Sequence, residues 1–389
     1  MEIRYGLISC DSHVAFGRDD FSARMSAKWG DLVPRVVEVE RSGGERVDGW
    51  SIYGRPGGNI CNCPALMGEP RPRYPKRWEE VPTLAYDPQE RLKALDIDRV
   101  DAEVLFPNPP GGPYFEFDDP EFERDAVRTY NDILSKWTLV SDRYLPLALL
   151  PWLQDPRNIA REIERAVEGG HRGITLGAIP PKGLPALMDP HWDPIWAACQ
   201  QMEVPVHFHA AGGFARAWGP KASGNGSWSG YTARQNHAMF TSLCPVGPSS
   251  TIPHLIFSGL TERFPRLKFV FAENGMGALN YAIAACDYEW EHRQLWKEGI
   301  FTRPSEVIRR QMFVNFWFED ECIKTRHDVG IDNIMWESDF PHVTSYYPRS
   351  WQAIERVLQG VPKDERRKML YENALRVYGV SATVVPHDA

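Results

Sequence analysis

The sequence lacks the features that mark membrane proteins and nucleic-acid-binding proteins. No apolar run approaches the roughly 18 residues that a membrane-spanning helix needs. Acidic residues outnumber basic ones, 52 to 44, and the resulting net charge of −8 argues against nucleic-acid binding, which usually needs a basic face. The one basic stretch, PRPRYPKR at 70–77, is rich in proline and is interpreted as a surface loop. We expect neither a membrane nor a nucleic acid as a partner.

A disulfide framework and a secretion signal are also missing. The seven cysteines are odd in number and scattered along the chain. Cys61 and Cys63 form a C-x-C pair without a second cysteine pair, which is a weak signal for a metal site. The first residues, MEIRYGLISCDSH, do not combine a basic region with a long apolar stretch. These observations predict a cytoplasmic protein.

No Gly-rich phosphate loop follows the first strand-like run, as it would in most open doubly wound sheets; the sequence there reads CDSHV. What the chain has is eight short apolar runs that alternate with amphipathic segments. The strand-like runs are 5–9, 102–106, 144–150, 172–177, 204–209, 267–273, 312–318 and 333–338, and the helix-like segments are 121–142, 156–169, 191–202, 276–298, 320–328, 348–359 and 362–379. This alternation predicts a (β/α)8 TIM barrel.

The stretch 15–87 forms a long insertion after the first predicted strand. It is rich in Gly, Pro and Arg and shows no sustained hydrophobic period. A long loop of this kind in a compact domain is usually functional or disordered. We expect one barrel domain over 1–389, in which 15–87 is a lid or an oligomer contact, and a homodimer in solution.

Histidines and carboxylates gather where the predicted strands end. They are Asp11 and His13 at the end of the first strand, His207 and His209 at the end of the fifth, Glu273 at the end of the sixth, and Asp339 and His342 just beyond the eighth. Any one of them alone is weak evidence, because a strand-end histidine or aspartate is commonly structural. The carboxyl ends of barrel strands share one mouth, and these residue types are ligands for divalent metals. Their joint occurrence predicts a metal site there.

Four stretches resemble the amidohydrolase-related branch, amidohydrolase 2, of the amidohydrolase superfamily. They read ISCDSHV, VPVHFHAAGG, HLIFSGLTERFPRLKFVFAENGMGALNYAI and IMWESDFPHVTSYYP. Members of this branch are metal-dependent hydrolases and non-oxidative decarboxylases on (β/α)8 barrels. The resemblance implies metal ligation by Asp11, His13, His207 and Asp339.

The sequence departs from the branch at two places. Its decarboxylases carry a histidine after the sixth strand, usually followed by glycine, whereas this chain has AENG with Glu273. Binuclear relatives carry a metal-bridging lysine on the fourth strand, which reads GITLG here. Asp11, Glu273 and Asp339 bring three negative charges when ionised, so one divalent ion leaves −1 and two leave +1. Two arrangements are therefore consistent with the sequence. Either the site binds one ion and one carboxylate is protonated, or Glu273 and Asp339 help to hold two ions. Zinc is favoured, with iron or manganese as alternatives.

Further residues are candidates for binding a bulky, apolar small-molecule substrate. Arg234 could pair with a substrate carboxylate, and His237 and His209 would lie near it. Trp317 and Tyr346 are expected near the mouth of the barrel, and aromatic residues make up 12% of the chain. His342 is expected to hold a metal ligand in place without binding the metal itself.

These residues favour a metal-dependent hydrolase of an ester, thioester or amide. A metal-activated water would attack the carbonyl, Asp339 would carry the proton, Glu273 would orient the water or hold a second ion, and His254 would polarise the carbonyl. The alternative is a metal-dependent non-oxidative decarboxylase of an aromatic or unsaturated acid. A scaffold protein on a degenerate barrel is disfavoured, because the set of ligand types is complete.

Overall fold

The chain of 389 residues is described here from a computed structural model, which divides into two compact units. The first unit comprises Met1–Ile174, Ser338–Glu355 and Val380–Ala389, and the second comprises Thr175–Glu337 and Arg356–Gly379. The structure describes residues 1–41, 43–57, 60–64, 73–108, 110, 117, 119–177, 180–181, 183–209, 232, 235, 238–239, 242 and 250–385.

The main sheet has eight strands in the order β2-β6-β7-β8-β9-β10-β11-β12, which is their order in the sequence. The strands are β2 (Ile8–Val14), β6 (Ala102–Pro107), β7 (Tyr144–Ala148), β8 (Gly173–Thr175), β9 (Val206–His209), β10 (Phe269–Ala272), β11 (Met312–Phe316) and β12 (Ile334–Trp336). In the first unit, β2, β6, β7 and β8 pair in parallel; in the second, β9 to β12 do the same. This succession is that of a (β/α)8 barrel, as the sequence predicts.

Asp-Pro pairs start three helices of the first unit. In α1 (Pro88–Asp98), α2 (Pro120–Val140) and α3 (Pro156–Glu168), a proline occupies the first turn, and the preceding aspartate accepts hydrogen bonds from backbone N–H groups there. The same unit holds the pair β1 (Glu2–Ile3) and β13 (Thr383–Val384). Helix α14 (Ser350–Val357) begins in this unit.

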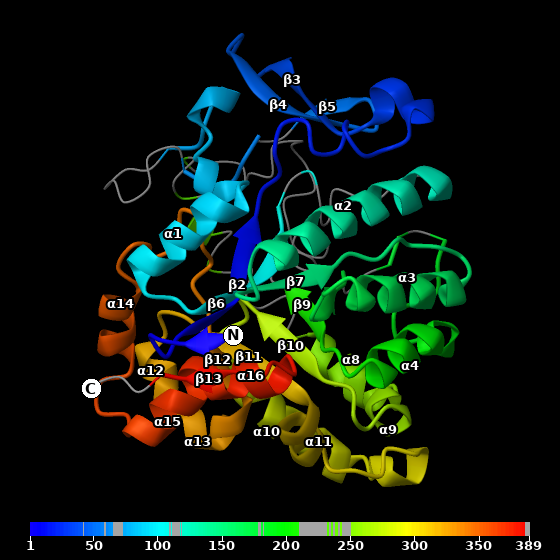
Figure 1. Ribbon diagram of the computed structural model, residues 1–389. Coiled ribbons are helices and arrows are strands. Elements are labelled where there is room, and N and C mark those ends of the chain that lie inside the picture. Colours follow the sequence, from blue (N-terminus) through cyan, green and yellow to red (C-terminus); the bar gives the residue numbers. More distant parts are fainter. Residues whose placement is uncertain are drawn as a thin grey trace. The chain divides into compact units, whose positions relative to one another are not determined.

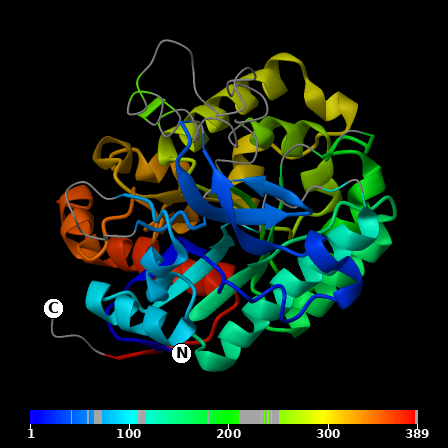
Figure 2. The same ribbon diagram turned by 90° about the horizontal axis from the view of Figure 1, so that it is seen from above.

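The insertion between β2 and α1 is more regular than its composition predicts. It contains a three-stranded antiparallel sheet, β3 (Arg35–Glu40), β4 (Arg46–Ile52) and β5 (Arg55–Gly57), beyond the carboxyl end of β2 (Figures 1 and 2). The RVVEVE stretch of β3 alternates as a half-exposed strand should, and Gly43 and Gly44 take positive φ in the turn that follows. The sequence did not reveal this sheet, because its strands are short and are separated by turns. The short helices η1 (Ala27–Leu32), η2 (Trp78–Glu80) and η3 (Thr83–Ala85) also lie in this stretch.

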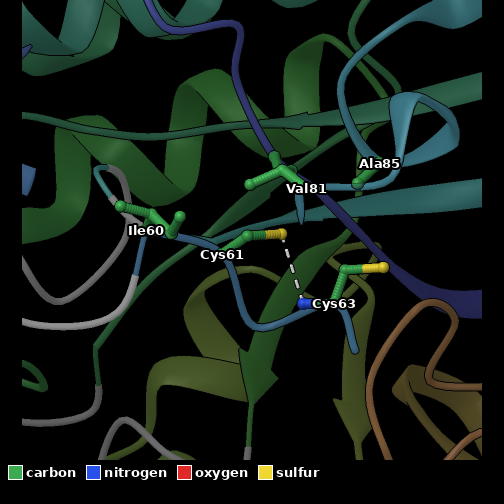
Figure 3. Packing of buried hydrophobic residues seen from close by; sticks show 6 residues of the cluster. Ile60, Cys61, Cys63, Val81 and Ala85 are labelled. Carbon is green, nitrogen blue, oxygen red and sulfur yellow. Dashed lines mark hydrogen bonds between the residues drawn. The ribbon is translucent and has the colours of Figure 1, made fainter. Parts of the chain in front are cut away.

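A small apolar cluster fixes part of the insertion to the end of β2. Its buried members are Ala15, Ile60, Cys61, Cys63, Val81 and Ala85. The backbone N–H of Cys63 donates to Cys61 Sγ at 3.2 Å (Figure 3). Both cysteines are buried as thiols, so the C-x-C pair is part of a packed core.

The second unit carries the other helices whose bounds the described residues define. They are α4 (Asp193–Gln201), α8 (Thr251–Phe257), α9 (Leu260–Arg263), α10 (Met276–His292), α11 (Pro304–Gln311), α12 (Asp320–Ile323), α13 (Arg326–Val329), α15 (Lys363–Arg367) and α16 (Asn373–Val377), with η5 (Pro190–Trp192), η6 (Leu295–Glu298) and η7 (Ile331–Asn333) between them. The single helix expected over 362–379 is divided by one π-helical turn, η8 (Lys368–Glu372). Among the described residues, no helix has the length and hydropathy to cross a bilayer.

Candidate metal centre

The carboxyl end of β2 brings two predicted ligands into the interior of the first unit. Asp11 is fully buried and His13 is 2% exposed. The pairing of β2 with β6 shifts register between Ser9 and Ser12, a local irregularity of the kind that often redirects side chains near active sites. The Asp339 N–H donates to the Asp11 carbonyl at 3.1 Å, so the two acidic residues are joined through the backbone.

Four polar side chains of the first unit meet at this strand end. His13 Nε2 lies 3.4 Å from Asp11 Oδ1 and 3.2 Å from Asp339 Oδ1, and His342 Nδ1 lies 2.7 Å from Asp339 Oδ1. The His13 and His342 rings stack with centroids 3.9 Å apart. Donor atoms of His13, Asp339 and His342 all lie within 4.8 Å of one another, close enough for one metal ion. Imidazole nitrogen and carboxylate oxygen suit zinc, iron or manganese, so these residues fit a divalent metal.

The protonation states favour metal binding. Burial and the nearby charge of His342 lower the pKa of His13, which keeps a ring nitrogen available as a ligand. Burial alone would raise the pKa of Asp339, but the charge and hydrogen bonds of His342 and His13 outweigh it and hold the pKa below its usual value. Asp339 is therefore an ionised carboxylate in this arrangement, which fits a ligand or a base better than a protonated acid.

Arg91 of α1 supports both backbone segments of the cluster. Its guanidinium donates to both carboxylate oxygens of Glu103 at 2.8 Å, to the His13 carbonyl at 3.1 Å and to the Phe340 carbonyl at 3.3 Å. It also lies 4.2 Å from the centroid of the Phe340 ring. Sequence analysis did not identify Arg91 or Glu103. The signal that could have revealed this pair is a charged residue at an apolar position, Arg91 in a helix and Glu103 in a strand.

His342 has partners on two further segments. Its Nε2 lies 3.0 Å from Asn108 Oδ1, which also accepts from Asn62 Nδ2 at 3.2 Å. The Thr344 hydroxyl donates to Asp339 Oδ2. Because Asn62 belongs to the insertion, the stretch between β2 and α1 reaches the histidine beside the cluster. These asparagines carry no motif, and the sequence did not reveal them.

The second unit holds the other predicted ligands in two separate arrangements. His207 is fully buried on β9, and its Nε2 lies 3.0 Å from the Tyr378 hydroxyl, with the two rings stacked. His209 Nε2 lies 3.3 Å from Glu273 Oε2. The Glu273 N–H donates to Glu337 Oε2 at 3.0 Å. His207 thus faces a core tyrosine, whereas His209 faces the acid that follows β10.

The remaining predicted site residues have different surroundings. Trp317 and Glu273 line the same cavity in the second unit. His254 is exposed on α8, and the cavity takes in its neighbour Pro253 instead. Tyr346 is half-buried in the first unit. The roles assigned to these residues stay predictions. Arg234 and His237 lie outside the described residues.

Comparison with known proteins gives concordant matches. The model of a family described as Amidohydrolase matches residues 76–380. A 2-amino-3-carboxymuconate-6-semialdehyde decarboxylase from Dictyostelium discoideum is 25% identical over 329 residues, covering 82% of this chain and 83% of that protein. Among solved structures, an amidohydrolase from Mycobacterium avium subsp. paratuberculosis K-10 has a TM-score of 0.74 at 19% identity, covering 96% of this chain and 99% of that one. A 5-carboxyvanillate decarboxylase from Novosphingobium aromaticivorans DSM 12444 with bound manganese has a TM-score of 0.65 at 18% identity, with 96% and 97% covered.

Proposed function

The chain belongs to the amidohydrolase family, and from this premise we propose that it is a metal-dependent non-oxidative decarboxylase of an unsaturated or aromatic carboxylic acid. The observation that carries the proposal is the similarity, over most of both chains, to the Dictyostelium decarboxylase. Sequence analysis favoured hydrolysis because of Glu273. The comparison favours what was then the alternative.

The ligands proposed from the first unit are Asp11, His13 and Asp339. Their donor atoms lie close together, because His13 Nε2 is 3.4 Å from Asp11 Oδ1 and 3.2 Å from Asp339 Oδ1. From the second unit we propose His209 in place of His207, because Nε2 of His207 already meets the Tyr378 hydroxyl. Ligands in a (β/α)8 barrel sit at the carboxyl ends of its strands, which is the basis for proposing strand-end residues from each unit. Manganese, zinc and iron all suit these donors, with one or two ions per chain.

The side chains around the ligands provide for proton transfer. A bound divalent ion supplies positive charge that holds an acidic substrate and stabilises negative charge in the reaction. His342 bridges Asp339 Oδ1 and Asn108 Oδ1, so a proton on its Nδ1 is held 2.7 Å from the Asp339 carboxylate. Decarboxylation breaks the bond to the carboxyl carbon, and the remaining carbon takes up a proton. We assign delivery of that proton to the Asp339–His342 pair.

Hydrolysis of an ester, thioester or amide is the second candidate, and Glu273 favours it. An ionised Glu273 would repel a substrate carboxylate by about 4 kcal/mol at 4 Å and an effective dielectric of 20. A protonated His209, 3.3 Å from Glu273, would offset part of this repulsion. In a hydrolase the same glutamate would orient the attacking water.

The two reactions differ in their products. Manganese- or zinc-loaded protein would be given 5-carboxyvanillate or 2-amino-3-carboxymuconate 6-semialdehyde in D2O, and aryl and thioesters in H2(18)O. We expect CO2 release with one solvent deuterium on carbon, abolished in His13→Ala and retained in His327→Ala, an exposed histidine on α13. Incorporation of 18O into a product carboxylate without CO2 release would establish the hydrolase instead.

Other expectations from the sequence stay proposals. They are a single barrel domain over 1–389, a lid or dimer contact in 15–87, a homodimer, and a cytoplasmic location. The hydrogen bond from Asn62 to Asn108 supports a role for the insertion at the site rather than at a distant surface.

A further inference from the structure

A cavity of about 580 Å³ lies in the second unit beside the His209–Glu273 pair. One wall is α10, which contributes four small residues, Gly277, Ala278, Ala282 and Ala285, and one large one, Tyr281. The facing wall is formed by Trp317, Phe318 and Cys322. The Trp317 and Phe318 rings contact each other with centroids 5.3 Å apart. The space is therefore bounded mainly by methyl groups and aromatic rings, and its size is within the range of small-molecule sites.

The charged groups in the described lining are all carboxylates, namely Glu273, Glu319 and Glu337. Each has a donor already. Glu319 accepts from the Trp317 and Phe318 backbone N–H groups at 2.7 and 3.0 Å, and Glu337 accepts from the Glu273 N–H. Glu273 itself faces His209. The carboxylates therefore repel an anionic ligand. Because each already accepts a hydrogen bond or faces a histidine, they also do not favour a cationic ligand strongly.

Two polar atoms of the lining have no hydrogen-bond partner among the described residues. They are Asn274 Oδ1 and Trp317 Nε1. Asn274 is 3% exposed, and leaving its amide oxygen buried without a donor is costly. A ligand with an uncharged donor, such as a hydroxyl or amine, would supply the hydrogen bond that Asn274 Oδ1 lacks, whereas Trp317 Nε1–H is itself a donor and takes a neutral acceptor. The polar and the apolar residues of the lining thus both favour a neutral, mainly apolar ligand.

We infer that this cavity binds an uncharged, apolar aryl or alkyl group carrying a neutral hydrogen-bond donor, with any ionised carboxylate of the ligand directed away from it. The identification of that ligand as the substrate rests on the proposed function, but binding itself does not. The cavity would then set which end of the substrate faces the reacting groups, because the anionic end is excluded from it.

Two probes with one skeleton and different charge test this inference. N-phenyl-1-naphthylamine is neutral and has an N–H donor, and 8-anilino-1-naphthalenesulfonate adds a sulfonate. Fluorescence titration of the metal-loaded full chain should show one site for the neutral probe and at least tenfold weaker binding of the sulfonate. Equal or tighter binding of the sulfonate would overturn the charge argument.

Cavity-filling variants locate the site. Ala278→Trp and Ala285→Trp occupy the space from two half-buried positions on α10, and each should weaken binding of the neutral probe at least tenfold. Tyr288→Trp adds the same side chain to an exposed position of that helix and should leave binding unchanged. Circular dichroism identifies variants that fold, and unaltered binding in both folded filling variants would refute the site. If the parent protein releases CO2 but does not bind the neutral probe, the cavity proposal is wrong and the decarboxylase stands. If the parent protein binds the probe but releases no CO2, the decarboxylase proposal is wrong and the cavity stands.

Discussion

Replacing Arg91 with methionine should destabilise the first unit more than any surface substitution on α1. Arg91 and Glu103 are both fully buried and joined by two hydrogen bonds of 2.8 Å. Methionine leaves the Glu103 carboxylate buried without its cation. Breaking a buried ion pair from one side costs about 3–5 kcal/mol. We expect a loss of this size in the free energy of unfolding, measured by guanidinium titration at neutral pH.

A double variant separates the two roles of Arg91. Arg91→Met with Glu103→Leu removes the uncompensated charge, and an apolar pair in place of a buried ion pair is often neutral or stabilising. The His13 and Phe340 carbonyls still lose their guanidinium donor, at 3.1 and 3.3 Å. We therefore expect most of the stability to return, while metal affinity stays about 10- to 100-fold reduced, as is typical when partners that orient ligands are removed.

The control is Lys93→Met on the same helix. Lys93 is 68% exposed and pairs with Glu90, and a pair of this kind contributes about 0–1 kcal/mol. Metal affinity would be measured by competition with a chelator of known strength. If Arg91→Met lost no more stability than Lys93→Met, or if the double variant bound metal like the parent protein, the support assigned to Arg91 would be wrong.

Two further predictions concern the histidines and a buried glutamate. His13→Ala and His209→Ala should each lose most of the bound metal, as measured by elemental analysis. His207→Gln should keep the metal but lower the free energy of unfolding by about 1–3 kcal/mol, because the hydrogen bond to Tyr378 is lost. If His209→Ala retained its metal, His207 would be the ligand instead. Burial raises the pKa of Glu123 to about 7, so the native state holds an extra proton between about pH 4.5 and 7 and stability falls as the pH rises through that window. Glu123→Gln should therefore be more stable than the parent at pH 8, by up to about 3 kcal/mol, and similar at pH 4; denaturation midpoints that differ equally at both pH values would contradict this.

The barrel could be predicted because its signals are local. Each parallel strand is a short apolar run, and α1, α2 and α3 each begin with an Asp-Pro pair that caps the helix. The insertion was less predictable, since β3 to β5 are short and separated by turns whose residues resemble a loop in composition. Local sequence does not say which short alternating stretches will find a partner strand.

The candidate site was predictable only as a set of ligand types. Asp11, His13 and Asp339 stood at strand ends, and the structure brings them together in the first unit. Our proposal of His209 rather than His207 as a ligand rests on Tyr378, which is 171 residues from His207 in the sequence. Arg91 and Asn108 act through contacts to residues 249 and 234 positions away. No sequence period encodes such contacts, because they arise from the packing of remote segments.

The two acids that follow β10 and β12 share an uncommon backbone conformation. Glu273 and Asp339 both have positive φ, 52° and 55°, in the left-handed region that side chains other than glycine rarely adopt. Such strain persists only where surrounding contacts impose it. At Asp339 the backbone N–H is held by the Asp11 carbonyl at 3.1 Å, and at Glu273 by the Glu337 carboxylate at 3.0 Å. The backbone at each of these two strand ends is therefore held by a hydrogen bond of the polypeptide itself, and at Asp339 a metal ion would meet a residue whose backbone is already fixed.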